Sequence, residues 1–238
     1  MISALIFAGG TGQRMSLSSK PKQFLELYGK PIIIYTLEHF EYHKEIDDIV
    51  IVSVESHINE LYSLLHRYGI TKVSKIVPGG NTGHDSIYNG LIAMKENAKK
   101  DDIVLIHDGV RPLITEELIS ENINAVRKYG AAITAELARE SVVHSIDGLN
   151  INNIPNRAEA YIAKAPQSFY YGKILTAYDK ASVDNVKTVD SAMLCNIYNI
   201  PMHIVESTKN NIKISNSTDF YMFRALYEAN ENQQIFGV

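Results

Sequence analysis

The chain has 238 residues, of which 45% are hydrophobic and 21% charged, a balance typical of a soluble globular protein with a substantial core. Its formal net charge of −4 at pH 7 argues against a nucleic-acid-binding protein that relies on bulk electrostatics. The single cysteine, Cys195, excludes an intrachain disulfide framework and indicates a reducing compartment.

The first apolar run, residues 2–7, predicts a buried strand that leads into a glycine-rich turn. No basic segment precedes this run, so we predict no signal peptide. No apolar run in the sequence approaches the ~20 residues that are needed to span a bilayer. We therefore expect a cytoplasmic protein that does not act in a membrane.

The turn that follows holds Gly9, Gly10 and Gly12, and two cations, Arg14 and Lys22, come after it. Glycines allow a sharp turn and bring bare backbone N–H groups close to a ligand. The string is not a Walker loop, and it lacks the third glycine of a dinucleotide-binding fingerprint. A cradle for a polyphosphate and a plain tight turn both remain open at this point.

Strand-like and helix-like segments alternate through the next hundred residues. Helices are predicted at residues 31–40, 58–68, 84–95 and 115–129, and strands at residues 47–54, 72–77, 102–106 and 131–135. The alternation predicts an α/β protein with a Rossmann-like, mostly parallel sheet and helices on both faces.

The alternation breaks after Glu136. Polar and apolar residues alternate over 139–157 around Asp147 and Gly148, which predicts a β-hairpin. Because the hairpin is too small to be a domain, we interpret it as an arm of a single domain, residues 1–238. Beyond the arm we predict helices at 172–180, 190–196 and 218–229, a strand at 202–205 and a loose tail at 230–238.

Three polar clusters follow predicted strands, at residues 9–14, 79–86 and 107–111. Ligands of open α/β sheets bind outside the carboxyl ends of the strands, so we expect the clusters to converge on one site. Asp108 directly follows an apolar strand, where a carboxylate needs a partner. A divalent metal ion and Arg111 are both open as that partner.

Eight short strings recur in an order and spacing typical of one enzyme family. They are AGGTGQRM (8–15), PKQF (21–24), GG…DSI (79–87), HDGVRP (107–112), NR (156–157), APQSF (165–169), VDSA (189–192) and NIKI (211–214). Over nearly its whole length the chain resembles the cytidylyltransferase family that includes methylerythritol-phosphate cytidylyltransferase and ribitol-5-phosphate cytidylyltransferase. The resemblance implies an enzyme that makes a CDP-polyol from CTP and a phosphorylated polyol and releases pyrophosphate.

The resemblance also implies roles for the residues in the matching strings. The catalytic residues would be Arg14, Lys22 and Lys213, acting by electrostatic stabilisation of the reacting phosphates. The nucleotide-binding residues would be Ala8, Gly9, Gly10, Gly12, Gly80, Asn81, Ser86 and Gly109. Asp108 would lie beside the Mg²⁺ of Mg²⁺–CTP, and Arg111, Ser141 and Arg157 would bind the phosphorylated polyol. Asp190 would either lie at the edge of the site or cap a helix.

In this family the arm reaches into a second subunit, so the resemblance implies a homodimer with shared sites. The chain departs from the common family pattern at four positions, Gly83, Gly109, Ser141 and Ala165, where Arg, Ala, Thr and Thr are usual. The missing arginine removes a charge near the nucleotide loop. His84 either replaces it in part or is a plain helix-start residue.

Two sequence features favour D-ribitol 5-phosphate over 2-C-methyl-D-erythritol 4-phosphate as the acceptor: AGG rather than AAG at 8–10, and the length of the loop between Arg14 and Lys22. The missing arginine at position 83 leaves a non-catalytic nucleotide-binding protein as an alternative, although the other predicted site residues are retained. A glycosyltransferase would need an Asp-x-Asp motif, which residues 107–109 do not supply.

Overall fold

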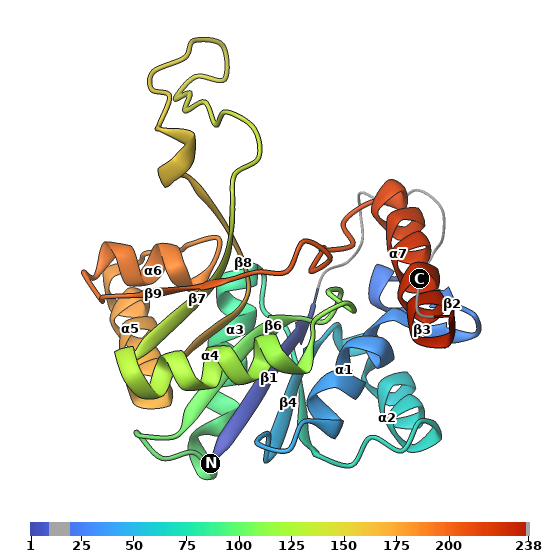
Figure 1. Cartoon of the computed structure of the whole chain (residues 1–238). Coiled ribbons are helices and arrows are strands. Elements are labelled where there is room, and N and C mark those ends of the chain that lie inside the picture. The colour runs from blue at the N-terminus through green and yellow to red at the C-terminus, as the bar shows by residue number, and fades with distance from the viewer. Residues whose placement is uncertain (10–19, 237–238) are drawn as a thin grey trace.

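Seven strands form one sheet in the structure, a computed structural model that describes residues 1–9 and 20–236 (Figure 1). The strands are β1 (Ile2–Ala8), β4 (Asp48–Ser53), β5 (Val73–Pro78), β6 (Ile103–Asp108), β7 (Ala131–Leu137), β8 (Tyr161–Tyr170) and β9 (His203–Glu206). Their order is β5-β4-β1-β6-β8-β7-β9, and every strand is parallel to its neighbours except β8. The predicted α/β fold with a mostly parallel sheet is therefore confirmed.

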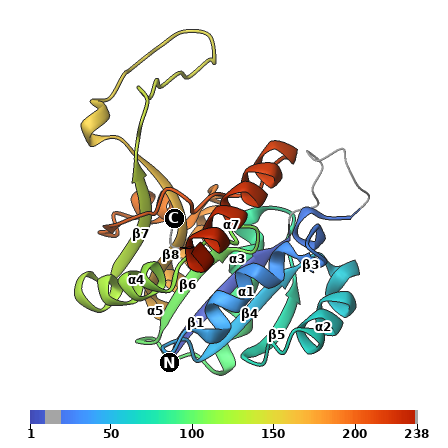
Figure 2. The same cartoon turned by 45° about the vertical axis from the view of Figure 1, so that its right-hand side comes forward.

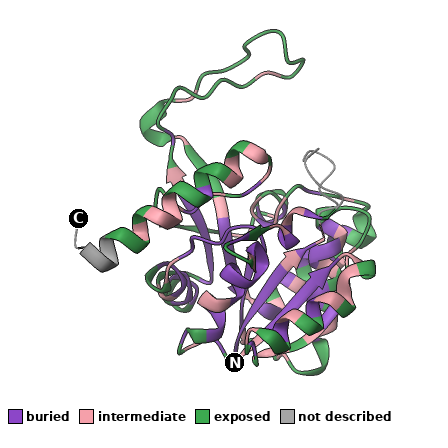
Figure 3. Cartoon of the chain, turned by 90° about the vertical axis from the view of Figure 1, so that its right-hand side faces the viewer, coloured by how far each residue is buried: buried purple, intermediate pink, exposed green. Residues whose placement is uncertain are grey.

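Helices cover both faces of this sheet (Figures 1 and 2). One face carries α1 (Ile32–Tyr42), α2 (Ile58–Arg67) and α4 (Glu116–Tyr129), and the other carries α3 (Gly83–Ala93), α5 (Tyr171–Asp184) and α6 (Ser191–Ile197). Alternate residues of β1 serve the two faces, because Ala4 and Ile6 belong to one buried cluster and Leu5 to the other. Buried residues accordingly fill the sheet and the inner helix faces, as Figure 3 shows.

Helix starts follow local sequence signals. Thr82 caps α3 and forms a capping box with Asp85, and the hydroxyl of Thr115 accepts a hydrogen bond from the N–H of Leu118 at the start of α4. Pro31 was predicted in the first turn of α1, but it is the N-cap residue, one position earlier. The predicted helices therefore begin within a residue or two of the observed ones.

The predicted arm leaves the sheet between β7 and β8, but it is not a β-hairpin (Figure 1). Within the arm, which is wholly described, a single isolated bridge joins His144 to Asn153. The turn lies where predicted, because the carboxylate of Asp147 accepts two backbone hydrogen bonds and Gly148 has a φ of +73°. A two-stranded ribbon without a second layer is marginally stable, and no described part of this chain forms a layer that covers the arm.

Two further expectations need correction. The sequence did not predict β8, because Pro166 in its middle argues against a central strand. The loose tail predicted at 230–238 is wrong for its described part, because α7 (Ser217–Phe236) continues to Phe236. The first half of α7 and the strand β2 (Glu26–Leu27), which pairs with β3 (Lys30–Pro31), contribute to a third buried cluster around Tyr35 and Phe223. Among the described residues, no helix combines the length and the apolar character that crossing a bilayer requires.

Candidate active site

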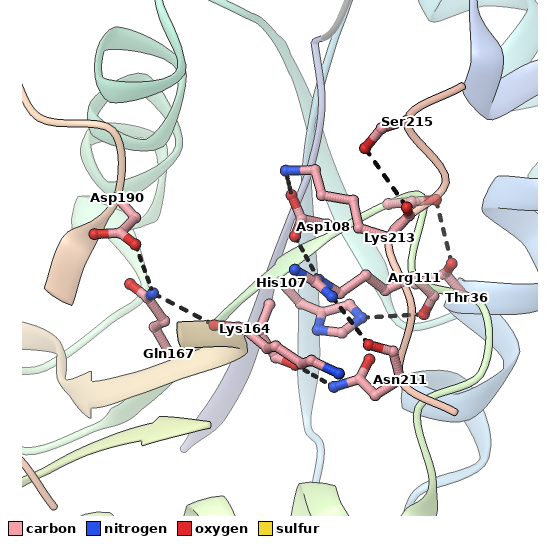
Figure 4. Close-up of polar contacts among 12 residues, drawn as sticks. Thr36, His107, Asp108, Arg111, Lys164, Gln167, Asp190, Asn211, Lys213 and Ser215 are labelled. Carbon is pink, nitrogen blue, oxygen red and sulfur yellow. Dashed lines mark hydrogen bonds and ion pairs between the residues drawn. The ribbon is translucent and has the colours of Figure 1, made fainter. Parts of the chain in front are cut away.

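Asp108 is the last residue of β6 and is buried between two cations (Figure 4). Its Oδ2 accepts a hydrogen bond from Nε of Arg111 at 2.7 Å, and its Oδ1 lies 2.5 Å from Nζ of Lys213. Burial alone would raise the pKa of the carboxyl group, but Lys213 and Arg111 outweigh it and lower the pKa to about 2. Asp108 is therefore ionised at neutral pH.

The two cations come from distant parts of the chain and are fixed by backbone contacts. The N–H of Arg111 donates to the carbonyl of Asp108, which closes a tight turn after β6. Nη1 of Arg111 donates to the carbonyl of Asn211 at 3.0 Å, and the Asn211 amide donates to the carbonyl of Ala165 at 2.7 Å. These contacts hold the segment that carries Lys213 against β6 and β8.

Neither His107 nor Cys195 offers a nucleophile to this site. Burial lowers the pKa of His107 to about 3, so the imidazole is neutral, and its Nε2 lies 3.3 Å from the carbonyl oxygen of Arg111. Cys195 lies on the face of the sheet opposite α4, and burial raises the pKa of its thiol to about 12. The arrangement around Asp108 suits charge stabilisation rather than covalent catalysis.

Two of the predicted nucleotide-binding strings meet at the carboxyl ends of β1 and β5. A Cβ atom on Gly9 would lie 3.4 Å from Oγ of Ser86 in α3 and 3.9 Å from Cα of Gly79. Oγ of Ser86 accepts a hydrogen bond from the N–H of Gly80 at 3.0 Å. A Cβ atom on Gly80 would lie 2.3 Å from Cβ of Asp85, so only glycine fits there. The structure therefore brings Gly9, Gly80 and Ser86 together, while Asn81 is exposed on the same loop.

The other predicted site residues that the structure describes near the triphosphate loop lie around the end of β1. Ala8 is its last residue, and the carbonyl of Ala8 accepts a hydrogen bond from the Gln23 amide at 2.5 Å. This contact places the short 3-10 helix η1 (Lys22–Phe24), and Lys22 with it, beside the strand end. Gly109 donates its N–H to the carbonyl of Phe7 at 3.0 Å. Three predicted residues, Gly10, Gly12 and Arg14, lie outside the described residues.

A cavity of about 190 Å³ opens beside Asp108, and we call it the active-site cavity. It is lined by Phe7, Ile87, Ile106, Asp108, Arg111, Ala163, Lys164, Ala165, Gln167, Val189, Asp190 and Lys213. Asp190 combines both predicted roles, because it lines this cavity and its Oδ1 accepts the N–H of Met193 as the N-cap of α6. We did not single out Lys164 or Gln167 from the sequence. Gln167 lies within the APQSF string, and Lys164 directly precedes it.

The predicted polyol ligands of the arm are not in this cavity of their own chain. Ser141 lines a second cavity of about 440 Å³ at the base of the arm, which we call the arm-base cavity. Arg157 lies in η4 (Arg157–Glu159), and its Nη1 donates to the carbonyl of Arg139 at 3.5 Å. Within one chain, Arg111 therefore stands apart from Ser141 and Arg157.

His84 does not replace the arginine that is missing at position 83. Its side chain is buried, its Nδ1 lies 3.3 Å from Oγ1 of Thr188, and its ring lies 4.7 Å from that of Tyr178. The interpretation as a helix residue is therefore correct, with the addition that the ring faces the core. Lys187 brings a different cation to this loop, 3.0 Å from Oδ2 of Asp85.

Comparisons with known proteins agree with this geometry. The family model described as "IspD: 2-C-methyl-D-erythritol 4-phosphate cytidylyltransferase" matches residues 2–228. A ribitol-5-phosphate cytidylyltransferase of Streptococcus agalactiae is 47% identical over 235 residues, 98% of each chain. A 2-C-methyl-D-erythritol 4-phosphate cytidylyltransferase of Clostridium botulinum is 38% identical over 227 residues, 95% of this chain and 97% of its own. The crystal structure of 4-diphosphocytidyl-2C-methyl-D-erythritol synthase from Anaerococcus prevotii has a TM-score of 0.82 at 30% identity, covering 95% of this chain and 96% of its own.

Proposed function

Because the chain belongs to the 2-C-methyl-D-erythritol 4-phosphate cytidylyltransferase family, we propose that it transfers the cytidylyl group of CTP to D-ribitol 5-phosphate. The family match confirms the predicted resemblance and the predicted enzyme class, a nucleotidyltransferase that uses CTP. The observation that carries the choice of acceptor is the 47% identity to the ribitol-5-phosphate enzyme, against 38% to the methylerythritol-phosphate enzyme. 2-C-Methyl-D-erythritol 4-phosphate is the alternative acceptor.

The nucleophile in this reaction is the phosphate of the acceptor. Its second pKa is ~6, so it is mostly dianionic at neutral pH. One of its oxygens bonds to the α-phosphorus of CTP while the bond from that phosphorus to the oxygen bridging toward the β-phosphate breaks. Pyrophosphate leaves with the electron pair of that bond. The protein needs to supply only positioning and charge stabilisation.

Lys213 is the described side chain best placed to stabilise this charge. Its ammonium group lies 2.5 Å from Asp108, yet the side chain is 39% exposed, so it can reach a bound triphosphate. We propose that Lys22 and Arg14 act from the opposite side of the triphosphate. The nucleotide itself would be held by Ala8, Gly9, Gly10, Gly12, Gly80, Asn81, Ser86 and Gly109.

The residues of the active-site cavity fit a magnesium ion that travels with CTP. Among the described residues, no group of three His, Cys, Asp or Glu side chains could hold a metal ion alone. Mg²⁺ typically binds one or two carboxylates together with substrate phosphates, and Asp108 and Asp190 both line this cavity. We propose that Asp108, ionised at neutral pH, is the protein ligand nearest the ion. When bound, the ion would neutralise phosphate charge.

The arm supports a homodimer in which each chain completes its partner's site. Its apolar side chains stand in solvent, with Ile146 80% and Leu149 89% exposed. A second copy of the chain would cover them and would bring Ser141 and Arg157 to a polyol beside Arg111. We propose that residues 1–238 act as one nucleotidyltransferase domain with 139–157 as its arm. We place it in the cytoplasm, since its one cysteine is buried and free.

The acceptor is tested by measuring pyrophosphate release from the purified protein with CTP, Mg²⁺ and a panel of phosphorylated polyols. We expect release with D-ribitol 5-phosphate and less than a tenth of that rate with 2-C-methyl-D-erythritol 4-phosphate. Absence of release with every member of the panel would refute the proposed reaction. Release with only the methylerythritol compound would replace the proposed acceptor by the alternative.

The shared site is tested by mixing two inactive variants, Lys213→Met and Arg157→Met. If each site takes Lys213 from one chain and Arg157 from the other, a mixed dimer regains one intact site. After equal mixing and exchange of subunits, about one quarter of wild-type activity should return, since about half of the dimers are mixed. No recovery in a demonstrated mixed dimer would assign both residues to the same chain's site.

A further inference from the structure

Lys164 separates the two cavities described above. The active-site cavity of about 190 Å³ holds Asp108 and Lys213, and the arm-base cavity of about 440 Å³ holds Ser141. Within the described part of the chain, Lys164 is the one residue that lines both. Its side chain therefore lies at the border between the active-site cavity and the base of the arm.

The Lys164 side chain is buried to a degree that is rare for lysine. It is 12% exposed, and its Nζ lies 2.5 Å from Oε2 of Glu136, which is 18% exposed. Oε1 of the same carboxylate accepts two hydrogen bonds from Arg139, at 2.9 Å from Nε and 2.6 Å from Nη2. One carboxylate thus serves two cations, and the cluster carries a net positive charge between the cavities.

The ammonium group of Lys164 retains hydrogen-bonding capacity. It has three N–H donors, and Glu136 is its one polar partner in the regions that the structure describes. Figure 4 shows the side chain extending toward Asn211, in the segment that also carries Lys213. A buried cation with unused donors, adjoining a site for anionic substrates, is suited to binding a phosphate group.

We propose that Lys164 binds the phosphate group of the polyol acceptor and that Glu136 positions it. The inference rests on the proposed cytidylyl transfer and adds a binding residue to it. The acceptor phosphate must approach the triphosphate beside Lys213, and a second cation lining the same cavity offsets the repulsion between the two anions. The polyol chain then extends toward Arg111, which lines the same cavity.

The test is a comparison of Michaelis constants for the wild type and Lys164→Met, with D-ribitol 5-phosphate and CTP varied in turn. We expect the KM for the polyol phosphate to rise about 10- to 100-fold, the loss typical of a charge-assisted hydrogen bond. The KM for CTP should change by less than about threefold. Lys164→Arg, which keeps the charge, should recover part of the affinity.

Lys75→Met is the matched control, because Lys75 also pairs with a glutamate, Glu96, but lies on the edge strand β5 away from both cavities. It should leave both constants unchanged. If Lys164→Met does not fold, the double variant Glu136→Gln/Lys164→Met also removes the charge of the carboxylate that has lost one of its two cations, and it is measured instead, with the same expected rise.

An unchanged KM for the polyol phosphate in an active, folded Lys164→Met would overturn the inference and leave the proposed function standing. An equal rise in both constants would also overturn it, because it would indicate a structural role for the ion pair. Absence of turnover by the wild type with every polyol phosphate would overturn the proposed function, and this inference with it.

Discussion

Replacing Lys213 by methionine should abolish most turnover while leaving the fold nearly intact. The substitution keeps the length and apolar stem of the side chain and removes the ammonium group that lies 2.5 Å from Oδ1 of Asp108. In the proposed reaction this group faces the phosphates whose charge changes most in the transition state. The effect of Lys213→Met on turnover should therefore be large while its effect on stability is small.

The structure sets the size of each effect. Loss of one preorganised donor at a developing negative charge typically lowers kcat by ~10²–10³, or about 2.7–4 kcal/mol of barrier. The structural loss is smaller, because the Lys213 side of the pair is 39% exposed, although Asp108 is 6% exposed, and we take the loss as about 1 kcal/mol. Asp108 keeps its second partner, Arg111, at 2.7 Å and so remains paired. We therefore expect a Tm within about 2–4 °C of the wild type.

Initial rates of pyrophosphate release at saturating CTP and D-ribitol 5-phosphate measure the kinetic effect, and thermal unfolding measures the structural one. Lys75→Met serves again as the control, with an unchanged rate, because its ion pair with Glu96 lies on an edge strand. A kcat within about threefold of the wild type would refute the reasoning, since the loss of one catalytic donor should lower kcat by ~10²–10³. A large drop in Tm would show that Lys213 holds the fold instead.

Three further predictions concern the nucleotide loop and the buried carboxylate. Ser86→Ala removes the hydroxyl that accepts a hydrogen bond from the N–H of Gly80, so the KM for CTP should rise about five- to tenfold while the KM for the polyol phosphate stays unchanged. A KM for CTP equal to that of the wild type would contradict this prediction. Gly80→Ala places a Cβ 2.3 Å from Cβ of Asp85, so calorimetry should find CTP binding weakened more than about tenfold, and wild-type binding would rule out the close approach. The pKa of Asp108 is lowered to about 2 in the folded protein from its ordinary 3.8, so its ionised form stabilises the fold by on the order of 2 kcal/mol. That contribution is fully present above about pH 4 and is lost as the pH falls through about 2. In urea unfolding, the stability difference between wild type and Asp108→Asn should shrink over this range, and a constant difference would count against the paired carboxylate.

Most helices and strands described within the first 136 residues were predictable because each carries its own signal, although the short strands β2 and β3 were not predicted. The strand at 47–54 is a β-branched run buried on both faces, and Thr115 marks the start of α4 before an amphipathic repeat. Asp108 could be recognised as special because an apolar strand leads directly into a carboxylate. Arg111 was one of its two candidate partners in the sequence, and the structure pairs them. Lys213 could not be chosen as a partner, since it lies about a hundred residues away and only the fold places it there.

The elements that the sequence did not reveal owe their form to tertiary contacts. β8 contains Pro166 and lacks a clear period, yet pairing with β6 on one side and β7 on the other makes it a central strand. The arm has alternating residues, but the parts of the chain that the structure describes offer it no layer to pack on, so it forms a turn at Asp147 without strands. Lys164 carried no signal in the sequence, because its burial and its pairing with Glu136 follow from the position of β8 beside β7.

The central claim is that this site prefers D-ribitol 5-phosphate as the acceptor for the cytidylyl group of CTP. The most direct measurement is a competition in one vessel, with limiting CTP, Mg²⁺ and equal concentrations of D-ribitol 5-phosphate and 2-C-methyl-D-erythritol 4-phosphate, and with the two CDP-polyols resolved by mass spectrometry. The product ratio equals the ratio of kcat/KM for the two acceptors. We predict a large excess of CDP-ribitol, at least about tenfold, and an excess of the methylerythritol product would contradict the claim.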